Sequence, residues 1–411
     1  MRALRGRFCD LARASGFHLT FISFAVFATA SLLVSLPRVH AQKQQSKSLP
    51  KPHRLDESVS WRRDPATGEL IVGRAAAGPE AGAQPAETAH SISVVTQIVP
   101  VTCSVVGADG VAIQNLQQKD FRVFDDGTAR PIVFFDASSQ PANVALLIDA
   151  SPSVLRESEE MKNAARALVD ALGTSDETAV VDFSAHSYLQ IPFSNDWGLI
   201  RKAVGRVDAR QLLGDVGGTN IYQAVFVAAT ELFAGRSGRK AIVLLTDGQD
   251  SGLGLTLDPE TSRPRPGFPP DRLTFEDVVR KLSAQDIQVF AVSTESRPKI
   301  MTADWLASHE DQTLLTRARA DEKIPAYTLY LTEMVRRSGG QLYFLREAET
   351  LADTFHQIAV KIRAEYTIGF SPADAADQTP RAGWHQLRVE VDGHPNATVV
   401  SRASYYVPAK P

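Results

Sequence analysis

Short apolar runs alternate with amphipathic segments through the centre of the chain. The apolar runs predict strands at 143–148, 178–184, 239–246, 286–293 and 341–345, with a short edge strand near 187–193. Apolar residues at helical spacing predict helices at 156–172, 197–206, 220–234, 274–284, 326–338 and 350–364. Alternation of buried strands with such helices is typical of a doubly wound parallel sheet. We therefore predict an α/β fold with a doubly wound, mainly parallel sheet over residues 141–364.

Segments on both sides of this centre alternate apolar and polar residues with a period of two. Residues 90–140 contain short alternating runs, and Asp126-Gly127 predicts a hairpin turn between 119 and 135. Residues 365–411 return to the same pattern. The termini of a domain often lie close together, so one domain can be inserted into another. We expect the two flanks to form one β-sandwich around the inserted α/β domain.

The N-terminus has the charged, apolar and small-residue order of a secretory signal peptide. Four arginines are followed by an apolar stretch at 17–36 and by Ala41, after which we expect cleavage. We therefore predict a signal peptide at 1–41 and export to the periplasm, cell envelope or extracellular space. The alternative is an uncleaved membrane anchor, because the apolar stretch approaches spanning length. Residues 42–89 are rich in Ala, Pro, Gly, Gln and charge, and are expected to form a flexible linker.

Composition narrows the classes of partner. The chain has 44 Lys and Arg against 47 Asp and Glu, which does not favour the broad basic surface that nucleic acid binding requires. After cleavage only Cys103 remains, so the exported chain has no internal disulfide. The alternation of Val99, Val101, Cys103 and Val105 with polar residues places this thiol on the inner face of a strand, where we expect it to be buried and inert.

Two carboxylates and three hydroxyls occur where predicted strands end or a helix begins. They belong to Asp149, Ser151, Ser153, Thr219 and Asp247. The carboxyl ends of parallel strands meet at one edge, which is where open α/β sheets bind ligands. Oxygen donors of this kind suit a hard divalent cation that keeps some water and one position for a partner. The pattern therefore predicts a metal site for Mg²⁺, with Mn²⁺ or Ca²⁺ as the other cations that suit these ligands.

The pattern Asp-x-Ser-x-Ser, then Thr, then Asp resembles the metal-ion-dependent adhesion site of the von Willebrand factor type A domain, which has a Rossmann-like fold. The resemblance implies that Ser151 and Ser153 bind the cation directly and that Asp149 and Asp247 hold it mainly through water. Thr219 would bind directly or through water, depending on the ligand. The flanks at 119–127 and 366–372 also resemble secreted bacterial proteins with a related domain, which extends the resemblance to residues 90–408. The alternative is a type A fold that lacks a working metal site.

The resemblance implies a non-enzymatic adhesion or protein-binding module, whose partner presents an Asp or Glu carboxylate to the cation. A metal-stabilised envelope scaffold is one alternative, and a Mg²⁺-dependent hydrolase is another. The hydrolase requires a base or nucleophile beside the metal. His186 is predicted to lie in a surface turn, and His309-Glu310 lacks the second histidine of a zinc-protease helix. Two long polar stretches, 250–272 and 294–323, are expected to border the metal site and to select the partner. The sequence leaves the oligomeric state open.

Overall fold

A computed structural model describes the chain at residues 48–65, 68–74, 98–108, 111–137, 140–207, 218–251, 272–308, 315, 324–345, 351–363, 365–372 and 381–408. The predicted signal peptide lies outside these residues, and so does His309-Glu310. Residues 252–271 of the first polar stretch, and 309–314 and 316–323 of the second, also lie outside them. Among the described residues, no helix combines the length and apolar character needed to cross a membrane.

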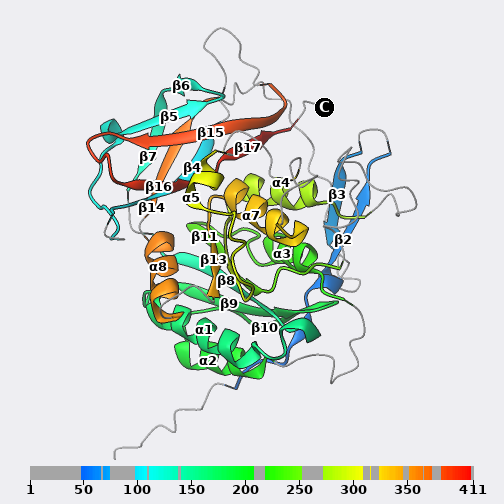
Figure 1. Ribbon diagram of the computed structural model, residues 1–411. Coiled ribbons are helices and arrows are strands. Elements are labelled where there is room, and N and C mark those ends of the chain that lie inside the picture. The colour runs from blue at the N-terminus through cyan, green and yellow to red at the C-terminus, as the bar shows by residue number, and fades with distance from the viewer. Residues whose placement is uncertain are drawn as a thin grey trace, which may run out of the picture. The chain divides into compact units, whose positions relative to one another are not determined.

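Within the described residues, one sheet has the strand order β1-β10-β9-β8-β11-β12-β13 (Figure 1). The strands are β1 (His53–Arg54), β8 (Ala142–Asp149), β9 (Glu177–Phe183), β10 (Ser187–Ser194), β11 (Arg239–Thr246), β12 (Gln288–Ser293) and β13 (Leu342–Phe344). Five neighbouring strands run parallel to one another: β9, β8, β11, β12 and β13. At the β9 edge, β10 pairs antiparallel with β9, and β1 pairs antiparallel with β10. The predicted doubly wound, mainly parallel sheet is confirmed.

Helices cover both faces of this sheet. One group is α1 (Ser158–Ala171), α2 (Trp197–Arg206) and α8 (Leu351–Arg363), and the other is α3 (Ile221–Glu231), α4 (Phe275–Gln285) and α7 (Ala326–Ser338). Strand β8 separates two cores because its side chains alternate: Leu146 packs with the first group and Leu147 with the second. Both leucines are fully buried, which explains why the strand is apolar without interruption. Helix α7 ends at Ser338, and Gly339 follows it with a φ of 86°, which supplies the left-handed cap.

The two flanks of the α/β domain pair with each other in two antiparallel sheets. The strands are β4 (Val99–Val106), β5 (Phe121–Asp125), β6 (Thr128–Arg130), β7 (Ile132–Asp136), β14 (Glu365–Phe370), β15 (Gly383–Val391), β16 (Thr398–Ser401) and β17 (Ser404–Val407). Within the described residues, the sheet orders are β16-β4-β14-β7 and β17-β15-β5-β6. Each sheet therefore contains strands from both sides of the insertion, as Figure 1 shows above the central sheet.

The apolar faces of these two sheets meet in a core of their own. Cys103 is fully buried there, opposite Tyr366 in the register between β4 and β14. Phe370 packs edge-on against Tyr405, with ring centroids 5.6 Å apart. The Asp126-Gly127 turn joins β5 to β6, but β7 does not extend this hairpin: it pairs with β14 in the other sheet. The predicted hairpin is therefore shorter than expected, because Pro131 separates β6 from β7 and lacks the N–H that a continuing ladder needs.

The predicted flexible linker is wrong over residues 48–63, here called the N-terminal strap. The strap contains β1, the short 3-10 helix η1 (Asp56–Ser58) and β2 (Val59–Arg63), which pairs with β3 (Leu70–Arg74). Leu55 and Val59 are buried in the same core as α3, and Trp61 packs edge-on against Phe226 at 5.7 Å. The strap was missed because these three apolar side chains are too few to produce a period, and β1 has only two residues.

Candidate metal centre

The ends of β8 and β11 place the first two acidic groups of the predicted site. These strands are parallel neighbours with Ile148 opposite Leu245, so the next residues, Asp149 and Thr246, lie side by side. The Thr246 hydroxyl donates a hydrogen bond to Asp149 Oδ2 at 2.7 Å. Asp247 follows at once, and its Oδ1 accepts a hydrogen bond from the backbone N–H of Gln249 at 2.8 Å. Two carboxylates therefore occupy one edge of the sheet.

The two serines of the motif lie beside Asp149. The Ser151 backbone N–H donates to Asp149 Oδ1 at 2.9 Å, which folds the chain back over the strand end. Pro152 begins a short 3-10 helix, η3 (Pro152–Val154), where its fixed φ suits the first position. This turn brings the hydroxyl oxygens of Ser151 and Ser153 to 3.0 Å from each other. The structure therefore brings both serine oxygens together at the end of β8.

Thr219 precedes α3 and is attached to the loop that follows β11. Its backbone N–H donates to the Ser251 hydroxyl at 3.1 Å, and the Ser251 N–H donates to the Thr219 carbonyl at 2.8 Å. A Cβ on Gly218 would lie 2.4 Å from the same hydroxyl, so the close approach requires glycine. The first helical N–H, of Ile221, donates to Asp250 at 2.7 Å. Two loops that are distant in sequence are thereby fixed together.

The electrostatics of this edge call for a cation. Asp149 is buried, and burial raises its pKa to about 7. Hydrogen bonds from Ser151 and Thr246 oppose this rise, and the nearby charge of Asp247 adds to it. Asp247 is also buried, and its Oδ2 has no hydrogen-bond partner among the described residues. An unpaired buried carboxylate oxygen is costly unless a cation or donor meets it. The donor set, all oxygen with two carboxylates, fits a Mg²⁺-type ion.

Three supporting residues were not predicted from the sequence. Thr246 orients Asp149, Ser251 holds the Thr219 loop and Asp250 caps α3. Asp250 and Ser251 lie at the start of the polar stretch 250–272, of which residues 252–271 lie outside the described part. Their positions just after Asp247 were the only signal, since their partners come from the distant β8 and α3 segments.

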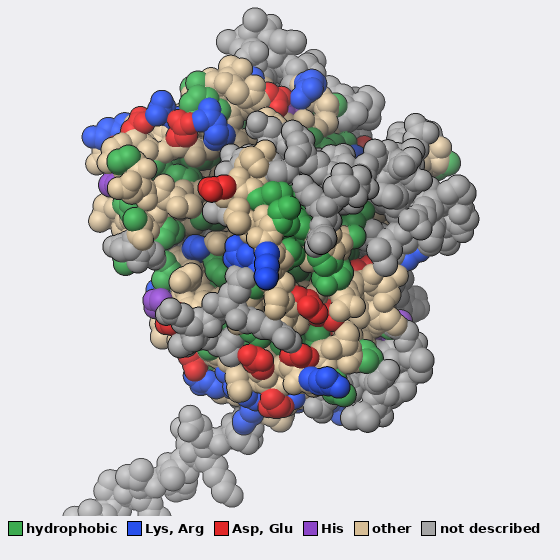
Figure 2. Space-filling view, viewed as in Figure 1, with side chains coloured by type: hydrophobic (Ala, Val, Ile, Leu, Met, Phe, Trp, Pro, Cys, Tyr) green, Lys and Arg blue, Asp and Glu red, His purple; other side chains and the backbone are tan. Residues whose placement is uncertain are grey.

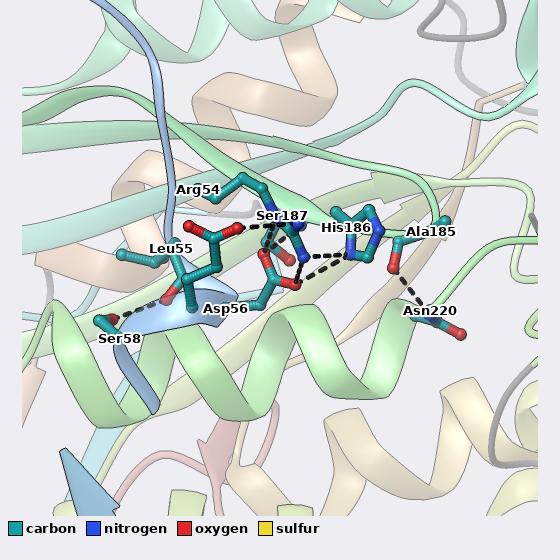
Figure 3. Close-up of polar contacts among 9 residues, drawn as sticks. Arg54, Leu55, Asp56, Ser58, Ala185, His186, Ser187 and Asn220 are labelled. Carbon is teal, nitrogen blue, oxygen red and sulfur yellow. Dashed lines mark hydrogen bonds and ion pairs between the residues drawn. The ribbon is translucent and has the colours of Figure 1, made fainter. Parts of the chain in front are cut away.

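The strap supports the same edge through His186 (Figure 3). Asp56 lies between Arg54 and His186, with its Oδ2 2.8 Å from Arg54 Nη2 and 3.0 Å from His186 Nδ1. The loop that contains His186 is tied to the residue after Thr219, because the Asn220 side-chain amide donates to the Ala185 carbonyl at 2.8 Å. The predicted turn at His186 is therefore an attachment point for the strap, and its side chain is only partly exposed, at 38%.

Replacing Asp56 by Asn is expected to destabilise the protein by about 1–3 kcal/mol at pH 7, the usual range for a buried hydrogen bond to a charged group. Burial works against ionisation of Asp56, but hydrogen bonds from Arg54 and His186 leave its pKa lowered. A lowered carboxyl pKa stabilises the fold above the unfolded value of 3.8, and this contribution is lost as pH falls further. Urea unfolding at pH 7 and pH 3 measures both effects.

The matched control for this substitution is Glu57→Gln, which removes a carboxylate that contacts the same Arg54 but is 63% exposed. An exposed pair contributes little, so this variant should unfold like the parent. Equal losses in the two variants would contradict the assignment of Asp56 as the anchor.

A cavity of about 400 Å³ borders the acidic edge. The chain immediately after Asp247 forms one wall, and Tyr222, Tyr327 and Tyr330 contribute aromatic surface. Burial, with the nearby Asp250 charge, raises the pKa of Tyr222 well above its ordinary value, and its hydroxyl has no hydrogen-bond partner among the described residues. The sheet edge that carries Asp247 is therefore next to a cavity with room for a side chain.

Residues 144–249 match the family model described as the von Willebrand factor type A domain. An aerotolerance-related membrane protein from Bacteroides fragilis is 16% identical with a TM-score of 0.37, over 54% of this chain and 98% of that chain. A von Willebrand factor type A protein from Catenulispora acidiphila is 14% identical, with a TM-score of 0.35 and coverage of 76% and 75%. Proximal thread matrix protein 1 from the mussel byssus, with a zinc-occupied MIDAS motif, is 15% identical, with a TM-score of 0.35 and coverage of 57% and 48%.

No curated protein matches the chain. The family match covers both strand ends that carry the acidic groups, β8 and β11, and the Thr219 loop between them. Together with the order of the parallel strands, it identifies the inserted domain. The chain contains a von Willebrand factor type A domain.

Proposed function

We propose that this protein is an exported, non-enzymatic binding module whose type A domain holds Mg²⁺ and captures a carboxylate of a partner protein. The convergence of the two serine hydroxyls beside Asp149 carries the proposal, together with the unpartnered Oδ2 of Asp247. Asp149, Ser151, Ser153, Thr219 and Asp247 would hold the ion. Mn²⁺ and Ca²⁺ accept the same oxygen donors.

The mixture of ligands explains why such an ion would bind an external carboxylate. When bound, the cation supplies a Lewis-acidic position for a further oxygen ligand. The hydroxyls of Ser151 and Ser153 carry no charge, so they leave much of the cation's charge uncompensated. Part of the carboxylate charge is already offset by neighbouring donors, since Thr246 bonds to Asp149 Oδ2 and Gln249 N bonds to Asp247 Oδ1. A partner's Asp or Glu would complete both the coordination and the charge.

Partner selection would depend on the surface around the ion, because every site of this kind offers the same cation. The cavity beside Asp247 supports this, since it has room for a side chain next to the partner's carboxylate. On the face seen in Figure 2, Lys and Arg side chains lie among Asp and Glu side chains. Such a mixed surface suits a protein partner better than a polyanion.

Binding is tested by capture from envelope extracts of the source organism on immobilised protein. A partner should be retained in Mg²⁺, released by a chelator, and lost with Asp247→Asn. The control Asp170→Asn should retain the partner, because it alters an exposed carboxylate on α1 that pairs with Arg201 on α2. Retention that is insensitive to both chelator and Asp247→Asn would refute capture through the metal. Mg²⁺ binding without any Mg²⁺-dependent partner would favour a metal-stabilised scaffold.

A further inference from the structure

A second group of metal-ligand side chains lies in the sandwich, outside the type A domain. Asp125 ends β5, Asp126 begins the turn to β6, and His385 lies near the start of β15. One ligand atom from each residue lies within 4.8 Å of the others. Strands β5 and β15 are adjacent in the sheet, so the group joins the turn to a neighbouring strand.

The hydrogen bonds of His385 define which of its nitrogens faces the carboxylates. Nε2 is 2.7 Å from the Arg381 carbonyl, which can only accept, so Nε2 carries a hydrogen. Nδ1 lies 3.1 Å from Asp126 Oδ2 and 3.3 Å from Asp125 Oδ1. The side chain is 5% exposed, and Nδ1 has no hydrogen-bond partner among the described residues. An unprotonated nitrogen facing two anionic oxygens is repulsive, so a positive centre is required at this point.

The distances around Nδ1 suit a metal ion shared by the three side chains. Zinc bonds to nitrogen and oxygen are about 2.0–2.2 Å long, so two ligand atoms of a tetrahedral ion are about 3.3–3.5 Å apart. The distances of 3.1 and 3.3 Å from Nδ1 to the two oxygens are close to this separation.

The surrounding groups orient the carboxylates as outer partners of a metal site usually do. Asp125 Oδ1 accepts a hydrogen bond from Tyr405 Oη at 2.9 Å, and Asp125 Oδ2 accepts one from Arg130 Nε at 3.1 Å. Asp126 Oδ1 accepts a hydrogen bond from Gln386 N at 2.8 Å, and Asp126 Oδ2 accepts one from Arg381 Nη2 at 2.9 Å. The two arginines offset part of the negative charge, which disfavours a cation held by charge alone. A cation bound here would therefore be one for which the imidazole nitrogen is itself a strong ligand.

We propose that Asp125, Asp126 and His385 form a second cation site, selective for zinc-type ions, that clamps the β5–β6 turn to β15. The Asp126 side chain is 40% exposed, so water can supply the fourth ligand and the ion can enter from solvent. The site does not depend on the Mg²⁺ site, because its ligands and its sheet are different.

The test uses the full chain with Asp149→Ala, which removes the first metal site from the measurement. Zn²⁺ affinity is measured by competition with a chromophoric chelator, and Co²⁺ absorption reports tetrahedral coordination. We expect at least ten-fold weaker Zn²⁺ binding on adding Asp126→Asn or His385→Gln, with loss of the Co²⁺ spectrum. Asn suits position 126, whose φ is 46° and which precedes a glycine, so this variant preserves the turn.

The control is Asp392→Asn. It removes an exposed carboxylate just after β15 that pairs with Arg122 and does not belong to the proposed site. It should bind Zn²⁺ as the Asp149→Ala parent does. Zn²⁺ binding that Asp126→Asn and His385→Gln leave unchanged would overturn the proposal. So would the absence of Zn²⁺ binding, and nitrogen NMR would then show His385 protonated on Nδ1. Neither result would bear on Mg²⁺ binding by the parent chain.

Discussion

A chain that ends after Arg363 is expected to aggregate when it is produced. This truncation removes β14, β15, β16 and β17, which leaves β4 and β7 without neighbouring strands and β5 with β6 alone. Each large apolar side chain that is fully buried contributes about 1.5–3 kcal/mol. The truncation removes buried side chains of this kind at Ile368, Phe370, Leu387, Val389, Tyr405 and Val407. Their sum approaches or exceeds the whole stability of an ordinary domain, about 5–15 kcal/mol.

Soluble yield and size-exclusion chromatography measure this effect. The control is a chain that ends at Pro408, which keeps every described strand and should remain monodisperse. A chain limited to 140–363 should be more soluble than the one that retains the N-terminal strands of the sandwich, because it exposes no half-sandwich. A soluble, monodisperse product from the chain ending at Arg363 would show that the N-terminal strands do not need their partners.

Mg²⁺ is expected to raise the melting temperature of the full chain by about 5–10 °C at one hundred times its dissociation constant. A ligand at that level stabilises the folded state by about 2.7 kcal/mol. For a domain of this size, each kcal/mol corresponds to about 2–4 °C. Asp149→Ala should abolish the rise, and Asp170→Asn should leave it unchanged. Equal Mg²⁺ responses in Asp149→Ala and the parent would show that Asp149 is not a ligand.

The same carboxylate predicts how pH changes stability without metal. Burial raises the pKa of Asp149 from 3.8 to about 7, so the folded chain holds this proton more tightly than the unfolded chain. Metal-free stability should therefore fall as pH rises from about 4 to about 7, by up to about 4 kcal/mol. Since the cation needs the ionised form, its stabilising effect should grow over the same interval. In Asp149→Ala, chemical unfolding at several pH values should show neither trend.

The centre of the fold could be predicted from sequence because its strands are buried on both faces. Strand β11 was predicted with its observed bounds, since no polar residue interrupts it between Ala241 and Leu245. Helix α7 was also predicted with its observed bounds, because Pro325 stands just before its first residue and Gly339 just after its last. The N-terminal strap has neither property. Its two-residue strand is held by the edge of β10, and this partner lies more than a hundred residues away.

The motif located the candidate metal residues, but it could not reveal how they are supported. Spacing alone placed Asp149 and Asp247 at strand ends, and the structure puts them on adjacent strands. The contact between Thr246 and Asp149 depends on strand register, which a sequence pattern does not specify. The same holds for the cluster at His385. Its aspartates read as an ordinary turn, and only the pairing of β5 with β15 brings the imidazole to them.

The sharing of one sandwich between two flanks determines the order in which the protein can fold. Tyr366 donates to the Ile113 carbonyl across 253 residues of chain, and contacts this distant form late because the loop must close first. Folding of the inserted domain shortens that loop, since its first strand follows β7 and its last helix leads directly into β14. The type A domain is therefore expected to fold first, as a unit, during emergence of the chain. Strand β5 keeps an unpaired edge until β15 emerges, and β4 keeps one until β16 emerges. During this interval the chain is most prone to pair with the wrong strands.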